Sequence, residues 1–179
     1  MELKVGPLGD YSYGEKWEET GRGKISHIFI TYDSRCVKSI QFGYVVNGAL
    51  VLSKRHGASE LKCKDDSTRI VRLNHETEFV TGISGKKWIR APLLPGINYF
   101  SPLSPLTFHT NERKHLAFEA ELGSLRGKRP LKAEFHSGIH DRRQFGGFFG
   151  SFGSFGLSSI GLYIRPILSG VHTIKQENV

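Results

Sequence analysis

The most informative stretch of the sequence for the fold is Gly146-Gly-Phe-Phe-Gly-Ser-Phe-Gly-Ser-Phe-Gly-Leu-Ser-Ser-Ile-Gly161. Strands are predicted on either side of its centre, over Phe145–Phe149 and Ser159–Ile164, with a glycine- and phenylalanine-rich loop between them. The glycines do not keep the GxGxxG spacing of a nucleotide-binding loop, and no Lys-Ser/Thr follows. Such a loop exposes backbone amides beside aromatic rings, which is the combination that sugar binding needs. A turn whose phenylalanines pack inward is the alternative.

Alternation of apolar and polar residues, the pattern of strands, dominates the rest of the chain. Residues 37–46 form the clearest example and stop at Asn47-Gly48, a strong hairpin signal, with 49–53 as the return strand. Further strands are predicted at 28–32, 70–74, 78–83 (ending at Ser84-Gly85), 103–110 and 112–122, and residues 126–130 are expected to be a basic loop. No strand–helix–strand alternation is present, so the pattern predicts an all-β sandwich, barrel or prism.

The length and composition of the chain narrow the classes of function that it can have. The chain has 179 residues, which suits one domain, and 25 Lys+Arg against 17 Asp+Glu give a net charge of +8. This charge favours acidic partners such as nucleic acid or an anionic membrane surface. A cluster of basic residues can bind phosphate or simply be solvated, and no RNA-binding signature accompanies it, so nucleic acid is disfavoured. The cluster consists of Arg126, Lys128, Arg129, Lys132, Arg142 and Arg143.

The compartment is predicted from the termini and the cysteines. Residues 1–6 do not resemble a secretory signal, and the most apolar stretch, residues 160–168, is short and contains Arg165, so no membrane span is expected. Cys36 and Cys63 form no CxxC pair; buried thiols in a reducing compartment are predicted, with one bridge between them as the alternative. These features favour the cytoplasm, with the nucleus also open.

The sequence gives little support for a catalytic or metal-binding site. His136 and His140 have a four-residue spacing, but a glycine between them disfavours the helix that zinc sites use. A nucleophilic pair of Cys63 with His56 or His75 has no positive support beside the simpler interpretation of a buried thiol and a surface histidine. We therefore expect no enzyme activity, no metal and no cofactor.

Motifs in a fixed order give the chain a family resemblance. The last of them, Gly147-Phe-Phe-Gly150 followed by Ile160-Gly-Leu-Tyr-Ile164, resembles the "GFHG…IGxY" ending of the jacalin-related plant lectins. The resemblance covers about residues 4–168 and includes Val5-Gly-Pro-Leu-Gly9, Gly14-Glu-Lys-Trp-Glu18, the "IxFxYxxNG…HG" pattern over residues 39–57, the "EYxxxxSG" pattern over 78–85 and the "LxFxTN" pattern over 106–111. Within the family, the chain is most similar to single-domain members that restrict virus movement.

This resemblance implies a fold and an activity. It implies a β-prism of three four-stranded antiparallel sheets over residues 1–168, followed by a polar tail at 169–179, and no catalysis. It also implies a shallow mannose/glucose-type sugar site. Carried over by position, the carbohydrate-binding residues are Gly14, Lys86, Ser154, Phe155, Gly156, Leu157 and Ser158.

The expected sugar site departs from the family pattern at its acceptor. The family's last loop carries an aspartate that accepts hydrogen bonds from two sugar hydroxyls, and Ser158 stands at that position. Losing the charge-assisted bonds costs about 1.5–3 kcal/mol, roughly ten- to a hundred-fold in affinity. The first loop is also altered, with Asp10, Tyr11 and Tyr13 where glycine and asparagine are usual.

Two functions therefore lead at this point, and a third, binding of nucleic acid or an anionic surface, rests only on the net charge. The first is binding of mannose/glucose-type glycans in plant defence through a weakened site. The second is a degenerate lectin that binds a protein partner in antiviral defence without binding sugar. Edge strands of a prism can also pair between copies, which would give a homodimer, although this expectation rests on analogy alone.

Overall fold

The structure is a computed structural model that describes residues 2–20, 23–57, 65–90, 103–121, 123, 126–136, 139–154 and 156–167. Within these residues the chain is built from strands, with a short 3-10 helix at Arg142–Gln144. No helix in this part of the chain is long and apolar enough to cross a membrane. The strands are β1 (Leu3–Gly9), β2 (Glu15–Thr20), β3 (Lys24–Tyr32), β4 (Val37–Val46), β5 (Ala49–Leu52), β6 (His56–Gly57), β7 (Ser67–Arg72), β8 (Val80–Arg90), β9 (Leu103–Thr110), β10 (Lys114–Phe118), β11 (Lys128–His136), β12 (Phe145–Gly153) and β13 (Gly156–Ile164).

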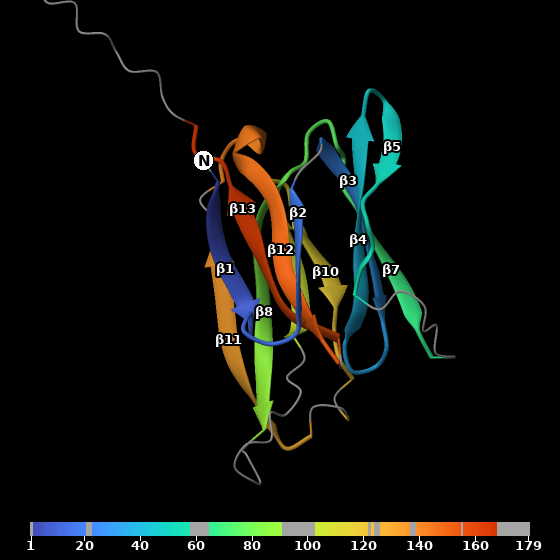
Figure 1. Cartoon of the computed structure of the whole chain (residues 1–179), viewed down its shortest axis with the longest axis vertical. Helices are drawn as coiled ribbons and strands as arrows, with labels where there is room; N and C mark the ends of the chain where they lie inside the picture. Colours follow the sequence, from blue (N-terminus) through green and yellow to red (C-terminus); the bar gives the residue numbers. More distant parts are fainter. Residues whose placement is uncertain are drawn as a thin grey trace, which may run out of the picture.

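The strands form three antiparallel sheets, which confirms the predicted all-β class (Figure 1). The first sheet has the order β1-β13-β12-β2 and therefore joins the two ends of the described chain. The second has the order β10-β9-β8-β11, and the third β5-β4-β3-β7. The third sheet differs slightly from the expected four strands, because the two-residue strand β6 also pairs with β4.

The hairpin predicted at Asn47-Gly48 is confirmed. β4 pairs with β5 on either side of it, with Val46 opposite Ala49. Asn47 and Gly48 have φ angles of 50° and 78°, and two consecutive positive φ values are what the tightest hairpin turns require. Asparagine and glycine adopt this conformation at low cost, which is why this turn could be predicted from the sequence.

Several predicted strand boundaries were wrong, because tertiary pairing extends or shortens the strands concerned. β8 does not end at Ser84-Gly85 but continues to Arg90, since β9 and β11 pair with it on both sides. Residues 128–130 of the expected basic loop lie in β11, opposite residues 88–90. Only Lys114–Phe118 of the segment 112–122 is a strand. Most of the expected glycine–phenylalanine loop is paired as well, because β12 and β13 run on to Gly153 and Gly156.

Some sequence predictions concern residues outside the described part of the chain. The polar tail at 169–179 is one of them, and Cys63 is another. Cys36 is a buried thiol, and burial raises its pKa to about 11. His140 is exposed, and its main-chain N–H donates to Gln144 Oε1.

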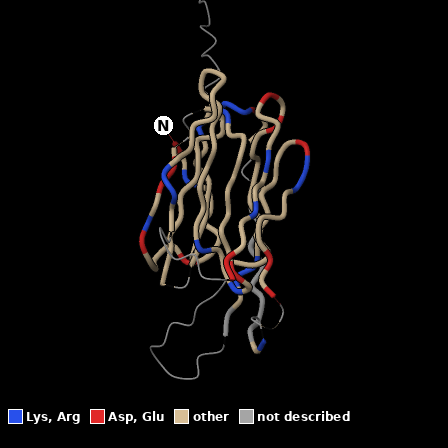
Figure 2. Tube along the Cα trace, turned by 90° about the vertical axis from the view of Figure 1, so that its right-hand side faces the viewer, with Lys and Arg blue, Asp and Glu red and all other residues tan. Residues whose placement is uncertain are grey.

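The core lies between the three sheets and is rich in aromatic rings. Phe148 of β12 stacks on Phe42 of β4, with ring centroids 4.5 Å apart, and meets Phe108 of β9 edge-on at 5.7 Å. One side chain thus contacts a ring from each of the other two sheets. Charged residues of both signs are distributed along the trace around this core (Figure 2). The structure therefore resembles a prism with an apolar axis and a mixed-charge surface.

Candidate functional site

The first loop, residues 10–14, lies against the β12–β13 hairpin, at the same end of the molecule as the hairpin turn (Figure 1). The Asp10 N–H donates to the Ser158 carbonyl oxygen at 2.9 Å, and the Ser151 hydroxyl donates to the Asp10 carbonyl oxygen at 3.1 Å. Both bonds use main-chain atoms of the loop, so they fix its position whatever its side chains are. Two segments about 140 residues apart in sequence therefore form one surface.

Gly14 closes this loop onto the hairpin. Its φ is +89°, a conformation that glycine adopts far more readily than other residues. A Cβ atom at Gly14 would collide with the Phe152 carbonyl oxygen and lie 2.8 Å from the Gly153 nitrogen. Only a residue without a side chain lets the loop approach the hairpin backbone this closely.

Tyr13 contributes an aromatic ring to the same surface. A Cβ atom at Gly153 would lie 2.5 Å from Tyr13 Cε1 and 2.9 Å from the Ser158 hydroxyl oxygen. The ring and the hydroxyl are therefore neighbours over Gly153, and Tyr13 is 43% exposed. An accessible aromatic ring beside a hydroxyl group matches a sugar ring, which has C–H groups on its face and hydroxyls around its edge.

Asp10 places a carboxylate at the edge of this surface. It accepts hydrogen bonds from the Ser12 N–H at 3.0 Å and the Ser12 hydroxyl at 2.5 Å. The hydroxyl bond is the main reason why the pKa of Asp10 is lowered, so the group stays ionised at neutral pH. Its Oδ2 atom lies 3.9 Å from the ammonium group of Lys87 on β8. The first loop thus provides an anionic hydrogen-bond acceptor, whereas the Ser158 hydroxyl is uncharged.

The seven residues expected from the sequence occupy different positions. Gly14 is exposed, Ser154 is exposed in the hairpin turn, and Ser158 is half-buried with its hydroxyl 3.5 Å from the Gly156 carbonyl oxygen. Leu157 is 1% exposed, so its side chain belongs to the core and only its main chain is left for a ligand. Gly156 is buried as well, Lys86 is half-buried on β8 opposite Lys132, and Phe155 lies outside the described residues.

Sequence reasoning missed three residues of this surface as contributors: Asp10, Tyr13 and Lys87. The sequence marked Asp10 and Tyr13 only as departures from the family pattern. Their composition was the available signal, since a carboxylate and an aromatic ring in one five-residue loop are both groups that bind sugars. The role of Lys87 depends on its approach to the first loop, which only the folded chain shows.

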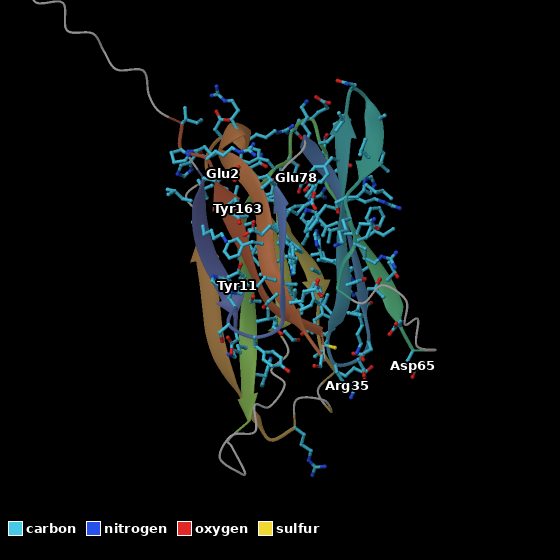
Figure 3. All side chains as sticks on the ribbon, in the orientation of Figure 1. Glu2, Tyr11, Arg35, Asp65, Glu78 and Tyr163 are labelled. Carbon is cyan, nitrogen blue, oxygen red and sulfur yellow. The ribbon has the colours of Figure 1, made fainter. Side chains whose placement is uncertain are left out.

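An aromatic and charged cluster covers the outer face of the first sheet. The Lys4 ammonium group lies 5.0–5.6 Å from the ring centroids of Tyr11, Phe149 and Tyr163, and it forms a 2.8 Å ion pair with Glu18. That ion pair is the main reason why the pKa of Lys4 is raised. Figure 3 labels Tyr11 and Tyr163 near each other on the first sheet, with Tyr11 below Tyr163. The contacts of Lys4 with the Tyr11 and Tyr163 rings hold the first loop against β1 and β13.

Comparison with known proteins agrees with this architecture. The family model for the jacalin-like lectin domain matches residues 5–163. Jacalin-related lectin 24 from Arabidopsis thaliana is 43% identical over 178 residues, which cover 97% of this chain and 72% of that protein. Protein RESTRICTED TEV MOVEMENT 1 from the same plant is 33% identical over 169 residues, covering 92% and 87%.

Solved structures show the same fold. The mannose-binding lectin from champedak superposes with a TM-score of 0.65 at 23% identity, covering 92% of this chain and 97% of that one. The artocarpin–mannotriose complex gives 0.63 at 23% identity with the same coverage. These structures carry the β-prism fold, so the predicted prism is confirmed. The chain therefore belongs to the jacalin-like lectin family, whose members are carbohydrate-binding proteins rather than enzymes.

Proposed function

We propose that this protein binds mannose- or glucose-type carbohydrate at the surface formed by the first loop and the β12–β13 hairpin. The observation that carries the proposal is the exposed Tyr13 ring beside the Ser158 hydroxyl, over Gly153. Two structural neighbours are described as a mannose-binding lectin and a mannotriose complex, which favours this class of ligand.

In this proposal each group has a separate task. The Tyr13 ring supports the C–H face of the sugar, and the Ser158 hydroxyl accepts or donates one hydrogen bond. The Asp10 carboxylate supplies an anionic acceptor from the loop instead of from the hairpin. Main-chain groups of Gly14 and Ser154, both exposed, complete the rim. Because the hairpin carboxylate is replaced, we expect weak affinity for a monosaccharide.

The test is calorimetric titration of the native chain and of Ser158→Asp with mannose and with a branched mannose oligosaccharide. Restoring the carboxylate should tighten binding by about ten- to a hundred-fold, since charge-assisted bonds contribute about 1.5–3 kcal/mol. Thr68→Asp is the matched control, because it adds the same charge at an exposed position on β7 (Ser67–Arg72), outside the proposed site. The proposal fails if neither the native chain nor Ser158→Asp releases heat with either sugar.

A second candidate is a protein-interaction module in plant antiviral defence that has lost sugar binding. Two observations favour it: a serine at the acceptor position, and 33% identity to Protein RESTRICTED TEV MOVEMENT 1. This candidate would be supported if the native chain gave no binding heat with sugar while Ser158→Asp did. The fold and the site would then be intact, and only the sugar-binding activity would have been lost. The buried thiol of Cys36 suits the cytoplasm or nucleus in either case.

A further inference from the structure

A second surface lies beside strand β2; it adjoins the proposed sugar site at Phe152 but is lined by other residues than Tyr13 and Ser158. A groove of about 510 Å³ runs between residues 15–18 of β2 and the segment 54–57 that leads into β6. Phe152, Trp17 and His56 line it from the inside, and Lys16, Lys54 and Arg55 line it from the outside. Neither Ser158 nor Tyr13 lines this groove.

The floor of the groove is rigid and aromatic. The rings of Trp17 and His56 stack with centroids 4.7 Å apart, and Phe152 lies 6.2 Å from Trp17. His56 Nε2 forms a 3.0 Å contact with Glu19 Oε2, and both of these side chains are less than a tenth exposed. A floor built in this way is already ordered before any ligand arrives, which lowers the entropic cost of binding.

Two polar atoms lack hydrogen bonds within the described residues, one on a side chain that lines the groove and one on a side chain that contacts His56 behind it. Trp17 Nε1 and Glu19 Oε1 are both buried and have no partner there. Buried polar groups in folded proteins are nearly always paired, so two such atoms in one cluster call for an explanation. Both atoms are closed off from solvent, so what Trp17, which is 93% buried, offers an occupant of the groove is the exposed part of its ring.

Strand β2 is the last strand of the first sheet. It pairs with β12 along Glu15–Thr20, and no strand in the described part of the chain pairs with its other side. Main-chain N–H and C=O groups on such an edge can pair with an added extended segment. Six residues of strand span roughly 20 Å, so an occupant of about the same length fits.

The charged side chains that line the groove favour an acidic peptide over other extended peptides. Lys16, Lys54 and Arg55 line the groove against two carboxylates, and one of these, Glu18, is already paired with Lys4. The remaining groups carry a positive excess, in line with the net charge of +8 for the whole chain. Acidic side chains on alternate positions of an added strand would meet the three cations, while the positions between them face the aromatic floor.

We propose that this groove binds an extended acidic peptide as an additional strand beside β2. Main-chain hydrogen bonds to β2 supply most of the affinity, and Lys16, Lys54 and Arg55 select for acidic sequences. The inference does not rest on sugar binding, since it uses different residues. It gives a chain of this family a site for a protein partner whether or not its sugar site works.

The test uses a fluorescein-labelled six-residue peptide that alternates glutamate and valine, measured by fluorescence anisotropy. The native chain should bind it, and raising salt from about 0.05 to about 0.3 M should weaken binding. Lys54→Glu/Arg55→Glu should weaken binding at least roughly ten-fold. Arg72→Glu/Lys114→Glu is the control, because both residues are exposed and lie outside the groove.

Two peptide controls separate strand addition from simple charge attraction. A peptide with N-methyl groups at alternate positions cannot pair with β2 and should not bind. A peptide that alternates lysine and valine should not bind either. Equal binding of the methylated peptide, or of the native and Lys54→Glu/Arg55→Glu proteins, would overturn the proposal.

Two further measurements fix the identity of the occupant and the independence of the site. If sedimentation shows a native dimer that Lys54→Glu/Arg55→Glu dissociates, a second copy occupies the groove and the peptide proposal is wrong. Ser158→Asp should bind the peptide as the native chain does, and Lys54→Glu/Arg55→Glu should leave any mannose titration unchanged. Failure of one site can therefore be told from failure of the other.

Discussion

At the scale of the residue, the backbone at Gly14 decides how closely the first loop approaches the β12–β13 hairpin. Gly14 and Gly48 both have positive φ angles, of 89° and 78°. They differ in their surroundings: a Cβ at Gly14 would collide with the Phe152 backbone, whereas a Cβ at Gly48 would have nothing within 4 Å. Comparing substitutions at Gly14 and Gly48 therefore separates the energetic cost of a side chain at positive φ from the cost of a steric collision.

Replacing these two glycines by alanine should therefore have unequal effects. Gly48→Ala should lower the free energy of unfolding by about 1 kcal/mol, the cost of a side chain in this conformation. Gly14→Ala should lower it by at least about 2–3 kcal/mol, because the loop must also move off the hairpin. Urea unfolding measures both, and equal losses would show that the loop does not need this close approach. Gly14→Ala should also weaken any sugar binding, while Gly48→Ala should not.

At the scale of the element, a buried carboxylate fixes one end of the second sheet. Glu78 precedes β8 and is fully buried, and it accepts hydrogen bonds from Thr110 at 2.8 Å and from the Asn74 N–H at 3.1 Å. His115 lies 2.6 Å from it, and Arg113 pairs with it at 3.4 Å. The β9–β10 turn is thereby held against the segment before β8. In Figure 3 this residue and Arg35 lie at opposite ends of the molecule, so Glu78 is remote from the turn between β3 and β4.

This network predicts how stability depends on pH. Burial by itself would raise the pKa of Glu78, but hydrogen bonds from His115, Arg113, Thr110 and Asn74 outweigh it and lower the pKa from 4.5 to about 2. A carboxyl group with a lowered pKa stabilises the fold above pH 4.5, and this contribution disappears as the pH falls toward 2. It amounts to about 3 kcal/mol at neutral pH.

Glu78→Gln should therefore destabilise the protein at pH 7 by about 3 kcal/mol, and the difference from the native chain should shrink between pH 4.5 and 2. Urea unfolding across this pH range measures the difference. Glu76→Gln is the control, because that exposed residue forms only surface ion pairs, with Lys24 and His75, among the described residues, and its unfolding midpoint should match that of the native chain. A difference that stays constant with pH would show that the carboxylate charge is not what stabilises the turn.

At the scale of the whole molecule, Phe148 connects the three sheets. It is fully buried and contacts Phe42 in the third sheet and Phe108 in the second. Phe148→Ala should lower the free energy of unfolding by about 3–5 kcal/mol, since the cavity would open where the sheets meet. Leu116→Ala, at a residue that is 43% exposed, should change it by no more than about 0.5 kcal/mol.

The same experiment tests whether the prism unfolds as one unit. Trp17 lies in the first sheet and Trp88 in the second, so tryptophan fluorescence reports on both, while circular dichroism reports on all strands. The two signals should show coincident urea transitions in the native chain and in Phe148→Ala. Separate transitions would mean that the sheets are stable independently and that Phe148 does not couple them.

The sequence by itself determined the fold class, the hairpin at Asn47-Gly48 and the approximate position of most strands, because alternation and turn residues are local properties. The family resemblance also predicted that the first loop and the last hairpin lie together, and the hydrogen bond between Asp10 and Ser158 confirms this placement. The ends of β8 and the start of β11 depended on pairing with strands distant in sequence, which no local pattern encodes. The contact of Tyr13 with Gly153 and the groove beside β2 likewise arise only when segments far apart in the chain pack together.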